Sequence, residues 1–176
     1  YRNLFVEAGQ SPQEITARIK TAFQQLFHGD PNSQAVYFSA GTNANGTLAY
    51  IHDVHSRDVR SEGMSYGMMI AVQLNQNAEF DALWNWSKTY MYHASSNHPA
   101  FGYFSWSMKT NGTPNDEMPA PDGEEYFATA LYFAALREGD VVATKAHASP
   151  VLYAIECLRG RLTADELRSL RVLGGL

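Results

Sequence analysis

The residues best suited to chemistry in this sequence are carboxylates gathered between positions 116 and 125. No lysine or arginine lies between Lys109 and Arg137, and this interval holds the acidic residues Asp116, Glu117, Asp122, Glu124 and Glu125. Charges of one sign at this density raise carboxyl pKa values unless solvent or partners relieve the repulsion. For Glu117 and Glu124 we predict a simpler arrangement, a solvated acidic loop followed by acids at a helix N-terminus, where the macrodipole favours them.

Asp122 is the carboxylate that the chain presents most rigidly. It follows Pro119 and Pro121 and precedes Gly123, at the start of a run of helical and aromatic character. Proline fixes one backbone dihedral, so this segment restricts the backbone that presents the Asp122 carboxylate. An N-cap aspartate, which accepts hydrogen bonds from the first turn of a helix, is the structural alternative.

Glu62 is the second carboxylate of interest, because it stands at the start of an apolar, methionine-rich segment. Desolvation there would raise the pKa of its carboxyl and keep the proton near neutral pH, which suits a general acid. The alternative is a first-turn glutamate paired with Arg60. The residue types alone do not decide between these two interpretations.

Two other patterns in the same region are weaker. Ser65 lies between Gly63 and Gly67 as in the nucleophile turn of serine esterases, but that turn needs a buried strand just before it. A serine esterase is therefore a distant alternative. His52 and His55 share a loop without a third ligand at useful spacing, so we predict no metal and no cofactor.

Three tryptophans differ in their surroundings. Trp84 and Trp86 lie in a helical run that is apolar around much of its circumference, so we predict that they belong to the core. Trp106 lies in the long irregular stretch from His93 to Pro121, and loops of this length are usually functional or poorly ordered. Because an aromatic face packs well against the C–H face of a sugar, Trp106 is the predicted platform.

Composition and charge limit the partners. Apolar residues make up 45% of the chain and charged residues 18%, and the formal net charge is −5. Without a cluster of lysine and arginine, we predict neither a nucleic acid nor an anionic membrane as a partner. No window has the roughly 18 uninterrupted apolar residues of a membrane span. The single cysteine, Cys157, excludes an internal disulfide. We predict a cytoplasmic protein, with secretion as the open alternative.

The elements that must position these residues are mainly helices. The predicted helices cover residues 12–26, beginning with a capping box at Ser11 and Glu14, and residues 61–74, 78–91 and 124–137. A small β-hairpin is predicted over residues 36–51, around Asn45 and Gly46. Two further amphipathic segments, 150–161 and 163–173, close the chain.

Three motifs resemble glycoside hydrolase family 8. They run from Asp58 to Met69, from Gly102 to Ser107 and from Pro119 to Ala128. With the opening run from Tyr1 to Phe5 and the run from Leu26 to Asp30, the sequence is most similar to its reducing-end xylose-releasing members. The resemblance implies an all-α fold, an (α/α)6 barrel of paired helices, and hydrolysis of β-1,4 glycans with inversion.

The resemblance also implies roles for single residues. By it, Glu62 is the general acid that protonates the leaving oxygen, and Asp122 positions and helps to distort the sugar beside the scissile bond. Trp106 matches an aromatic residue that lines this subsite. Tyr66 and Glu125 are the other two predicted substrate-binding residues.

The general base is unknown. In the family it is an aspartate in a later helical region, within a run that this sequence lacks. Asp53 or Asp58 can substitute only if the fold places one of them across the sugar from Glu62, since an inverting site needs its two carboxyl groups roughly 6.5–9.5 Å apart.

The resemblance covers residues 1–140, which we assign to the N-terminal half of a truncated barrel. Residues 141–176 form an unassigned helical tail that does not resemble the family. Half a barrel leaves apolar faces exposed, which predicts a homodimer through these faces. The predicted activity is the release of xylose from the reducing end of xylo-oligosaccharides. The alternatives are a non-catalytic sugar-binding remnant or another family specificity, such as endoglucanase or chitosanase.

Overall fold

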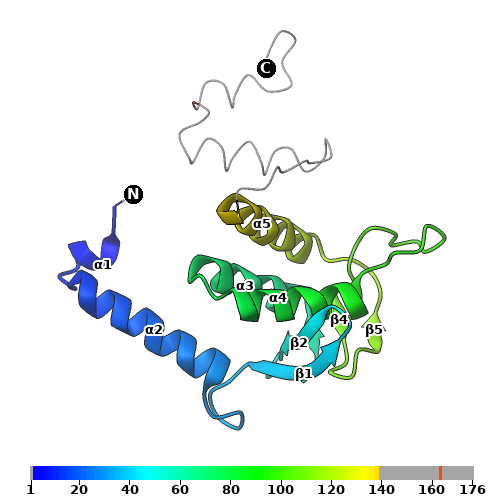
Figure 1. Cartoon of the computed structure of the whole chain (residues 1–176), viewed down its shortest axis with the longest axis horizontal. Helices are drawn as coiled ribbons and strands as arrows, with labels where there is room; N and C mark the ends of the chain where they lie inside the picture. Colours follow the sequence, from blue (N-terminus) through cyan, green and yellow to red (C-terminus); the bar gives the residue numbers. More distant parts are fainter. Residues whose placement is uncertain (1, 139–162, 164–176) are drawn as a thin grey trace. The chain divides into compact units, whose positions relative to one another are not determined.

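The computed structural model describes residues 2–138 and residue 163 (Figure 1). The chain divides into two compact units, residues 1–127 and residues 128–176, and every site residue discussed below lies in the first. The helices are α1 (Leu4–Glu7), α2 (Pro12–His28), α3 (Ser61–Gln73), α4 (Asn77–Trp86), the π-helical turn η1 (Ser87–Met91) and α5 (Pro121–Glu138). The strands are β1 (Tyr37–Asn43), β2 (Gly46–Ile51), β3 (Val59–Arg60), β4 (Ser107–Met108) and β5 (Pro114–Asp116).

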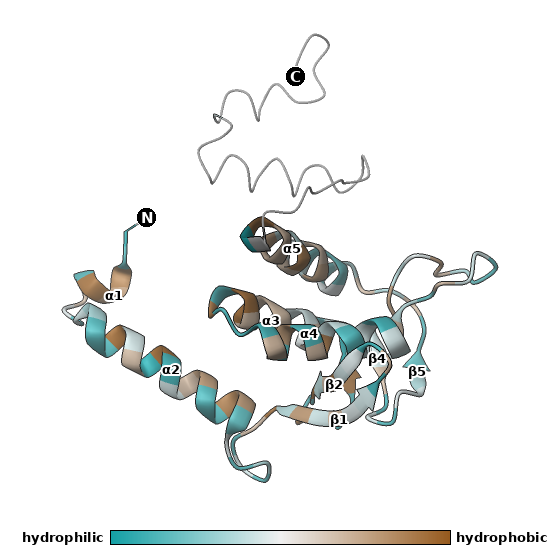
Figure 2. Cartoon of the chain, viewed as in Figure 1, coloured by the Kyte–Doolittle hydropathy of each residue, from teal (hydrophilic) through white to brown (hydrophobic). Residues whose placement is uncertain are grey.

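Helix α2 begins as the sequence predicts. The Ser11 hydroxyl accepts a hydrogen bond from the Glu14 N–H at 3.2 Å, and the Glu14 carboxylate accepts one from the Ser11 N–H at 2.9 Å. Polar and apolar residues alternate along this helix (Figure 2). Its buried rings, Phe23 and Phe27, stack with centroids 4.4 Å apart, and Phe27 also stacks on Tyr37 at 5.3 Å. These rings join α2 to the hairpin.

Strands β1 and β2 form the predicted antiparallel hairpin. Gly46, at its turn, has a φ of +119°, a conformation that residues with a Cβ rarely adopt. The hairpin packs on α4, where the buried Asn85 amide donates hydrogen bonds to the Thr47 carbonyl at 3.0 Å and the Gly46 carbonyl at 3.2 Å. This helix therefore satisfies backbone groups that a two-stranded sheet leaves unpaired.

Helices α3 and α4 form the core with β2. The side chains of Met64, Met68 and Leu83 are fully buried, and the Met64 sulfur accepts a hydrogen bond from the Ile51 N–H at 3.2 Å. Trp86 is 1% exposed, as predicted for a core residue. The helix predicted over residues 78–91 is present, but its last turn is the π-helical η1.

A second, three-stranded sheet corrects the prediction of helices with a single hairpin. Strands β3, β4 and β5 are antiparallel neighbours in that order, with Arg60 opposite Ser107 and Ser107 opposite Asp116. The stretch from His93 to Pro121, predicted to be irregular, thus contains two short strands. Strands of two or three residues are too short to show the period-two alternation that identifies a strand in sequence.

About half of the described residues are helical, and they form no closed barrel. Within them, no helix is long and apolar enough to cross a membrane. The predicted domain boundary at residue 140 and the predicted helices over 150–161 and 163–173 fall outside the described residues, apart from Thr163. Exposed apolar side chains do occur on α1 and α2, at Leu4, Phe5, Val6, Ile19 and Leu26. The homodimer through such faces stays a prediction.

Two glycines four residues apart on α3 give a matched test of this packing. A Cβ on Gly67 would lie 2.7 Å from Ile51 Cγ1 and 3.0 Å from Leu83 Cδ1, whereas on Gly63 the nearest atom would be Ile51 Cγ2 at 3.5 Å. We expect Gly67→Ala to lower the free energy of unfolding by about 1–3 kcal/mol through overpacking. Gly63→Ala should raise it by up to about 1 kcal/mol, because alanine favours the helix. Urea titration measures the free energy of unfolding of both variants. Equal effects of the two substitutions would contradict the close packing of Gly67 against Ile51 and Leu83.

Candidate active site

The predicted general acid, Glu62, is positioned by the junction of strand β3 and helix α3. The strand ends at Arg60, whose extended backbone caps the helix, and Glu62 stands in the first turn. The Ser61 N–H donates a hydrogen bond to the Trp106 carbonyl at 3.0 Å. The Ser61 hydroxyl also bonds Glu62 Oε2 at 3.2 Å. The pairing of β3 with β4 therefore places Trp106 beside the residue that precedes Glu62.

Asp122 approaches the same point from helix α5, because Gly123 touches Ser61. A Cβ on Gly123 would lie 2.4 Å from Ser61 Oγ and 2.7 Å from Ser61 Cβ, distances that no real side chain adopts. Only glycine permits the first turns of α3 and α5 to come this close. Since Glu62 follows Ser61 and Asp122 precedes Gly123, the contact brings the two predicted carboxylates into one neighbourhood.

Asp122 lies inside the first turn of α5, which corrects the N-cap alternative. The helix begins at Pro121, and its first intrahelical hydrogen bond runs from the Glu124 N–H to the Ala120 carbonyl at 3.1 Å. Ala120 therefore occupies the N-cap position. The Asp122 side chain is exposed rather than consumed by capping.

Two tyrosines border this neighbourhood. Tyr66 and Tyr126 are 44% and 43% exposed, and their rings meet edge to face with centroids 4.8 Å apart. Desolvation, with the negative charges of Asp122 and Glu62, raises the pKa of the Tyr66 hydroxyl. The structure thus brings Tyr66, Asp122 and Glu62 together, and it adds Tyr126, which the sequence reasoning missed although it lies one turn after Asp122.

Glu125, the last of the predicted substrate-binding residues, is exposed on α5. It lies three positions after Asp122, and residues three apart lie on one side of a helix. Its placement is therefore compatible with the predicted role, which stays a prediction.

Trp106 is held on several sides. Its N–H donates to the Met118 carbonyl at 2.9 Å, and its indole donates a hydrogen bond to Asp116. The guanidinium of Arg60 lies over the indole, 5.3 Å from the ring centroid. The bonds from Met118 N–H and from the indole lower the pKa of the Asp116 carboxyl. The predicted platform is thus a partly buried ring in a fixed setting.

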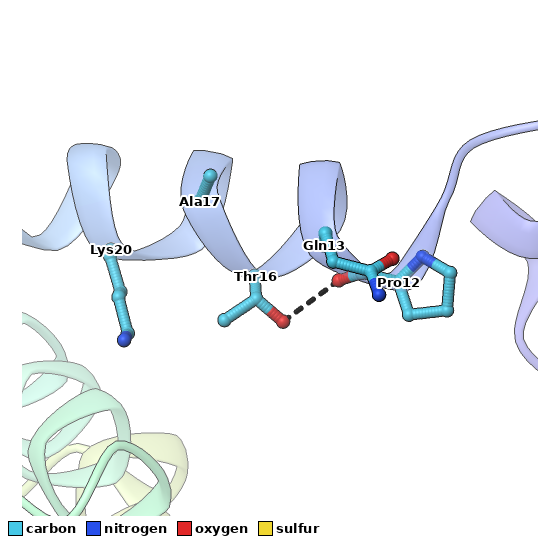
Figure 3. Close-up of a pocket in the computed structure, with 5 residues that line it drawn as sticks. All are labelled: Pro12, Gln13, Thr16, Ala17 and Lys20. Atoms are coloured by element: carbon cyan, nitrogen blue, oxygen red, sulfur yellow. Dashed lines mark hydrogen bonds between the residues drawn. The ribbon is translucent and has the colours of Figure 1, made fainter.

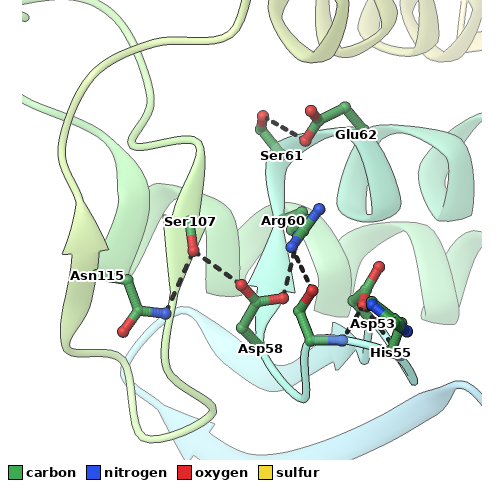
Figure 4. Close-up of polar contacts among 9 residues, drawn as sticks. Asp53, His55, Asp58, Arg60, Ser61, Glu62, Ser107 and Asn115 are labelled. Carbon is green, nitrogen blue, oxygen red and sulfur yellow. Dashed lines mark hydrogen bonds and ion pairs between the residues drawn. The ribbon is translucent and has the colours of Figure 1, made fainter.

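Arg60 does not make the ion pair with Glu62 that was the alternative to the general-acid interpretation. Its Nε bonds Asp58 Oδ1 at 3.1 Å, and its terminal nitrogen bonds the Ser56 hydroxyl (Figure 4). Asp58 is only 8% exposed, and its second oxygen accepts from the Ser107 hydroxyl at 2.9 Å. These bonds tie the loop before α3 to strand β4.

Asp53 and Asp58, the possible substitutes for the general base, both stabilise this loop. Both oxygens of Asp58 are occupied by Arg60 and Ser107. Asp53 Oδ1 accepts hydrogen bonds from the N–H groups of Ser56 at 2.6 Å and His55 at 3.1 Å, which lowers the pKa of Asp53. The hydrogen bonds of each carboxylate therefore stabilise this loop.

Glu124 lies in the first turn of α5, at a helix N-terminus as predicted, but its carboxyl is partly buried rather than solvated. Its Oε1 accepts a hydrogen bond from the Phe104 N–H at 2.7 Å, and burial raises the pKa of its carboxyl. Glu117 does match that prediction, because it is exposed and lies 3.3 Å from the His98 imidazole. The sequence could not separate the two, since burial of Glu124 depends on the distant Phe104.

Two weaker patterns also have structural outcomes. Ser65 is buried inside α3 and donates to the Glu62 carbonyl at 3.0 Å, so it does not lie on a strand-to-helix turn. This excludes the esterase nucleophile. Within residues 2–138 and 163, no three histidine, cysteine, aspartate or glutamate side chains are grouped to hold a metal ion. A groove on α2, lined by Pro12, Gln13, Thr16, Ala17 and Lys20, has no carboxylate (Figure 3).

Comparison with known proteins decides the family. The model of glycosyl hydrolases family 8 matches residues 37–155, more than half of the chain. The chain belongs to glycosyl hydrolases family 8. This confirms the resemblance found in the sequence motifs, which include the segments that carry Glu62, Trp106 and Asp122.

The relatives that match this chain include proteins named for the release of xylose and for xylanase activity. A reducing end xylose-releasing exo-oligoxylanase of Halalkalibacterium halodurans is 49% identical over 140 residues, covering 80% of this chain and 34% of that protein. The exo-oligoxylanase Rex8A of Paenibacillus barcinonensis is 46% identical over the same length. The crystal structure of a family 8 xylanase mutant from Teredinibacter turnerae, complexed with xylohexaose, is 64% identical with a TM-score of 0.78, covering 81% of this chain and 36% of that one. The chain spans about a third of the length of the curated relatives it matches.

Glu124 gives a pH-dependent prediction. Its folded pKa lies above its ordinary value of 4.5, so between these values the folded chain binds more protons than the unfolded chain. The stability that protonated Glu124 contributes is complete below 4.5 and is lost as pH rises through the raised pKa. Glu124→Gln keeps an oxygen for the Phe104 N–H but carries no charge. We expect its free energy of unfolding to equal that of the wild type near pH 4. Above pH 4 it should exceed the wild-type value by an amount that grows with pH and then levels off.

Urea titration at several pH values from about 4 to about 8 measures this difference. Glu117→Gln is the matched control, because its carboxylate is exposed in the same acidic segment. A difference between Glu124→Gln and the wild type that stays constant across the pH range would contradict the proposed burial cost.

Proposed function

We propose that this chain carries the acid side of an inverting glycoside hydrolase site that cleaves β-1,4-xylo-oligosaccharides and releases xylose from the reducing end. The observation that carries the proposal is the meeting of Glu62 and Asp122 at the Ser61–Gly123 contact, next to Trp106. The names of the exo-oligoxylanase relatives support the substrate class. For the whole protein we propose the (α/α)6 barrel of paired helices.

In this proposal Glu62 donates its proton to the glycosidic oxygen as the bond to the anomeric carbon breaks. A water attacks that carbon from the opposite face, and a base takes the water's proton, so the configuration inverts. Asp122, close to Glu62, accepts hydrogen bonds from sugar hydroxyls and holds the ring in the distorted shape of the transition state. Trp106 packs against the sugar, while Tyr66 and Glu125 border the subsite.

The base is assigned to none of residues 2–138. Asp53 and Asp58 are the described aspartates considered for this role, and the hydrogen bonds of both stabilise the loop before α3. The proposal therefore requires a further carboxylate across the sugar from Glu62.

A xylanase that cuts longer chains internally is the second candidate. It is favoured by the 64% identity to the family 8 xylanase that was solved with xylohexaose. An endoglucanase specificity is a third candidate with weaker support, since the endoglucanase of Pseudomonas fluorescens is 38% identical over only 77 residues.

Hydrolysis of xylohexaose, followed by NMR and chromatography, tests the proposal. We expect xylose and xylopentaose as first products, with the newly formed reducing end in the α configuration. Glu62→Gln should lower the rate by about 10²- to 10⁴-fold, the usual contribution of a general acid. Glu7→Gln, which removes an exposed carboxylate from the pair with Arg2, is the matched control and should change nothing measurable.

The outcomes separate the candidates. Shorter internal products would favour the xylanase. Retained β configuration would contradict the inverting mechanism. No turnover by the wild-type chain, together with binding of xylohexaose, would support a non-catalytic sugar-binding protein.

A further inference from the structure

Arg60 has an unusual set of contacts for a residue beside a candidate acid. Its guanidinium bonds a buried carboxylate, bonds the Ser56 hydroxyl and lies over the indole of Trp106. Asp58 and Ser56 bind nitrogens of the guanidinium, so its plane is oriented by two partners from the loop before α3. Arginine is suited to this combination because its planar group forms directed hydrogen bonds and stacks on an aromatic face at the same time.

The partner of Arg60 is itself fixed. Asp58 accepts a hydrogen bond from the Ser107 hydroxyl at 2.9 Å, and Ser107 is the next residue after Trp106. The Asn115 amide donates to the same hydroxyl at 3.2 Å, which links β5 to the network (Figure 4). The guanidinium is therefore anchored, through Asp58, to Ser107 of strand β4. Trp106, which carries the indole, directly precedes this strand.

The indole has little freedom left. Its backbone is tied to Ser61 and Met118, and its ring N–H is tied to Asp116. Arg60 covers one of its two faces. An aromatic ring with one face covered can stack on one sugar ring only, through the other face.

We propose that Arg60 is a positioning residue that covers one face of Trp106 and so fixes the other face for a single sugar ring. Arg60 acts through Trp106 and does not contact the substrate. The sugar-binding part of this inference rests on the proposed function, whereas the positioning of the indole does not.

The experiment compares Arg60→Ala with Lys109→Ala, which removes an equal charge from an exposed site directly after strand β4. The first readout is near-UV circular dichroism without sugar. The signal of Trp106 is isolated by subtracting, for each protein, the spectrum of its Trp106→Phe counterpart. We expect this signal to be present in the wild type and in Lys109→Ala, and to fall at least twofold in Arg60→Ala.

The second readout is the quenching of tryptophan fluorescence by xylotriose. Loss of a cation–π contact and of the fixed ring should weaken binding by about 3- to 30-fold in Arg60→Ala. Because Arg60→Ala leaves Asp58 buried without its partner, the double variant Arg60→Ala with Asp58→Asn removes that stranded charge. It should fold with the wild-type far-UV spectrum and still lack the Trp106 signal.

Each result decides a part of the inference. An unchanged Trp106 signal in both Arg60 variants, or no Trp106 signal in the wild type, overturns the positioning role. A lost signal together with unchanged xylotriose affinity overturns its importance for the sugar. If the wild type does not bind xylotriose but the Arg60 variants still lose the Trp106 signal, the positioning role is supported. The proposed function is then what fails.

Discussion

The contact between Gly123 and Ser61 is the constraint on which the candidate site depends. Helices α3 and α5 are separated by almost fifty residues in the chain, yet their first turns touch where Gly123 has no side chain. Both helices present a carboxylate directly beside this contact. A methyl group there would push the helices apart, and Glu62 and Asp122 would no longer face one neighbourhood. The absence of one Cβ therefore determines whether the two acids share one neighbourhood.

The small three-stranded sheet provides the second part of the site. It pairs Arg60, the residue before α3, with Ser107, the residue after Trp106, so the helix that carries Glu62 begins beside Trp106. Asp58 is buried, and its hydrogen bonds to Arg60 and Ser107 stabilise the pairing of β3 with β4. A buried carboxylate is costly unless both of its oxygens are bonded, and here they are. The charges of Asp58 and Arg60 thus serve the structure, whereas Glu62 and Asp122 lie outside this network.

Local signals in the sequence predict the local elements well. The capping box at Ser11, the hairpin around Gly46 and the periodic helices predicted within residues 2–138 are present, with boundaries that differ by a few residues. Such local signals do not predict which distant segments of the chain contact one another. The sequence could not indicate that Glu124 is buried against Phe104, that Arg60 turns to Asp58 and Trp106, or that Gly123 faces Ser61, because each depends on segments brought together only by the fold. Asp122 and Glu62 stand out by their setting in the sequence, and the family motifs give them their expected roles. Tyr126 has a simple signal that was missed, its spacing of one helical turn from Asp122.

A double-mutant cycle at Ser61 and Gly123 tests the central contact most directly. The free energy of unfolding is measured for the wild type, Gly123→Ala, Ser61→Gly and the double variant. If the two residues touch, Gly123→Ala alone costs about 1–3 kcal/mol, and removing the Ser61 side chain recovers part of that cost in the double variant. Effects that add to within about 0.5 kcal/mol would show that the residues are not in contact and that α5 does not bring Asp122 to Glu62.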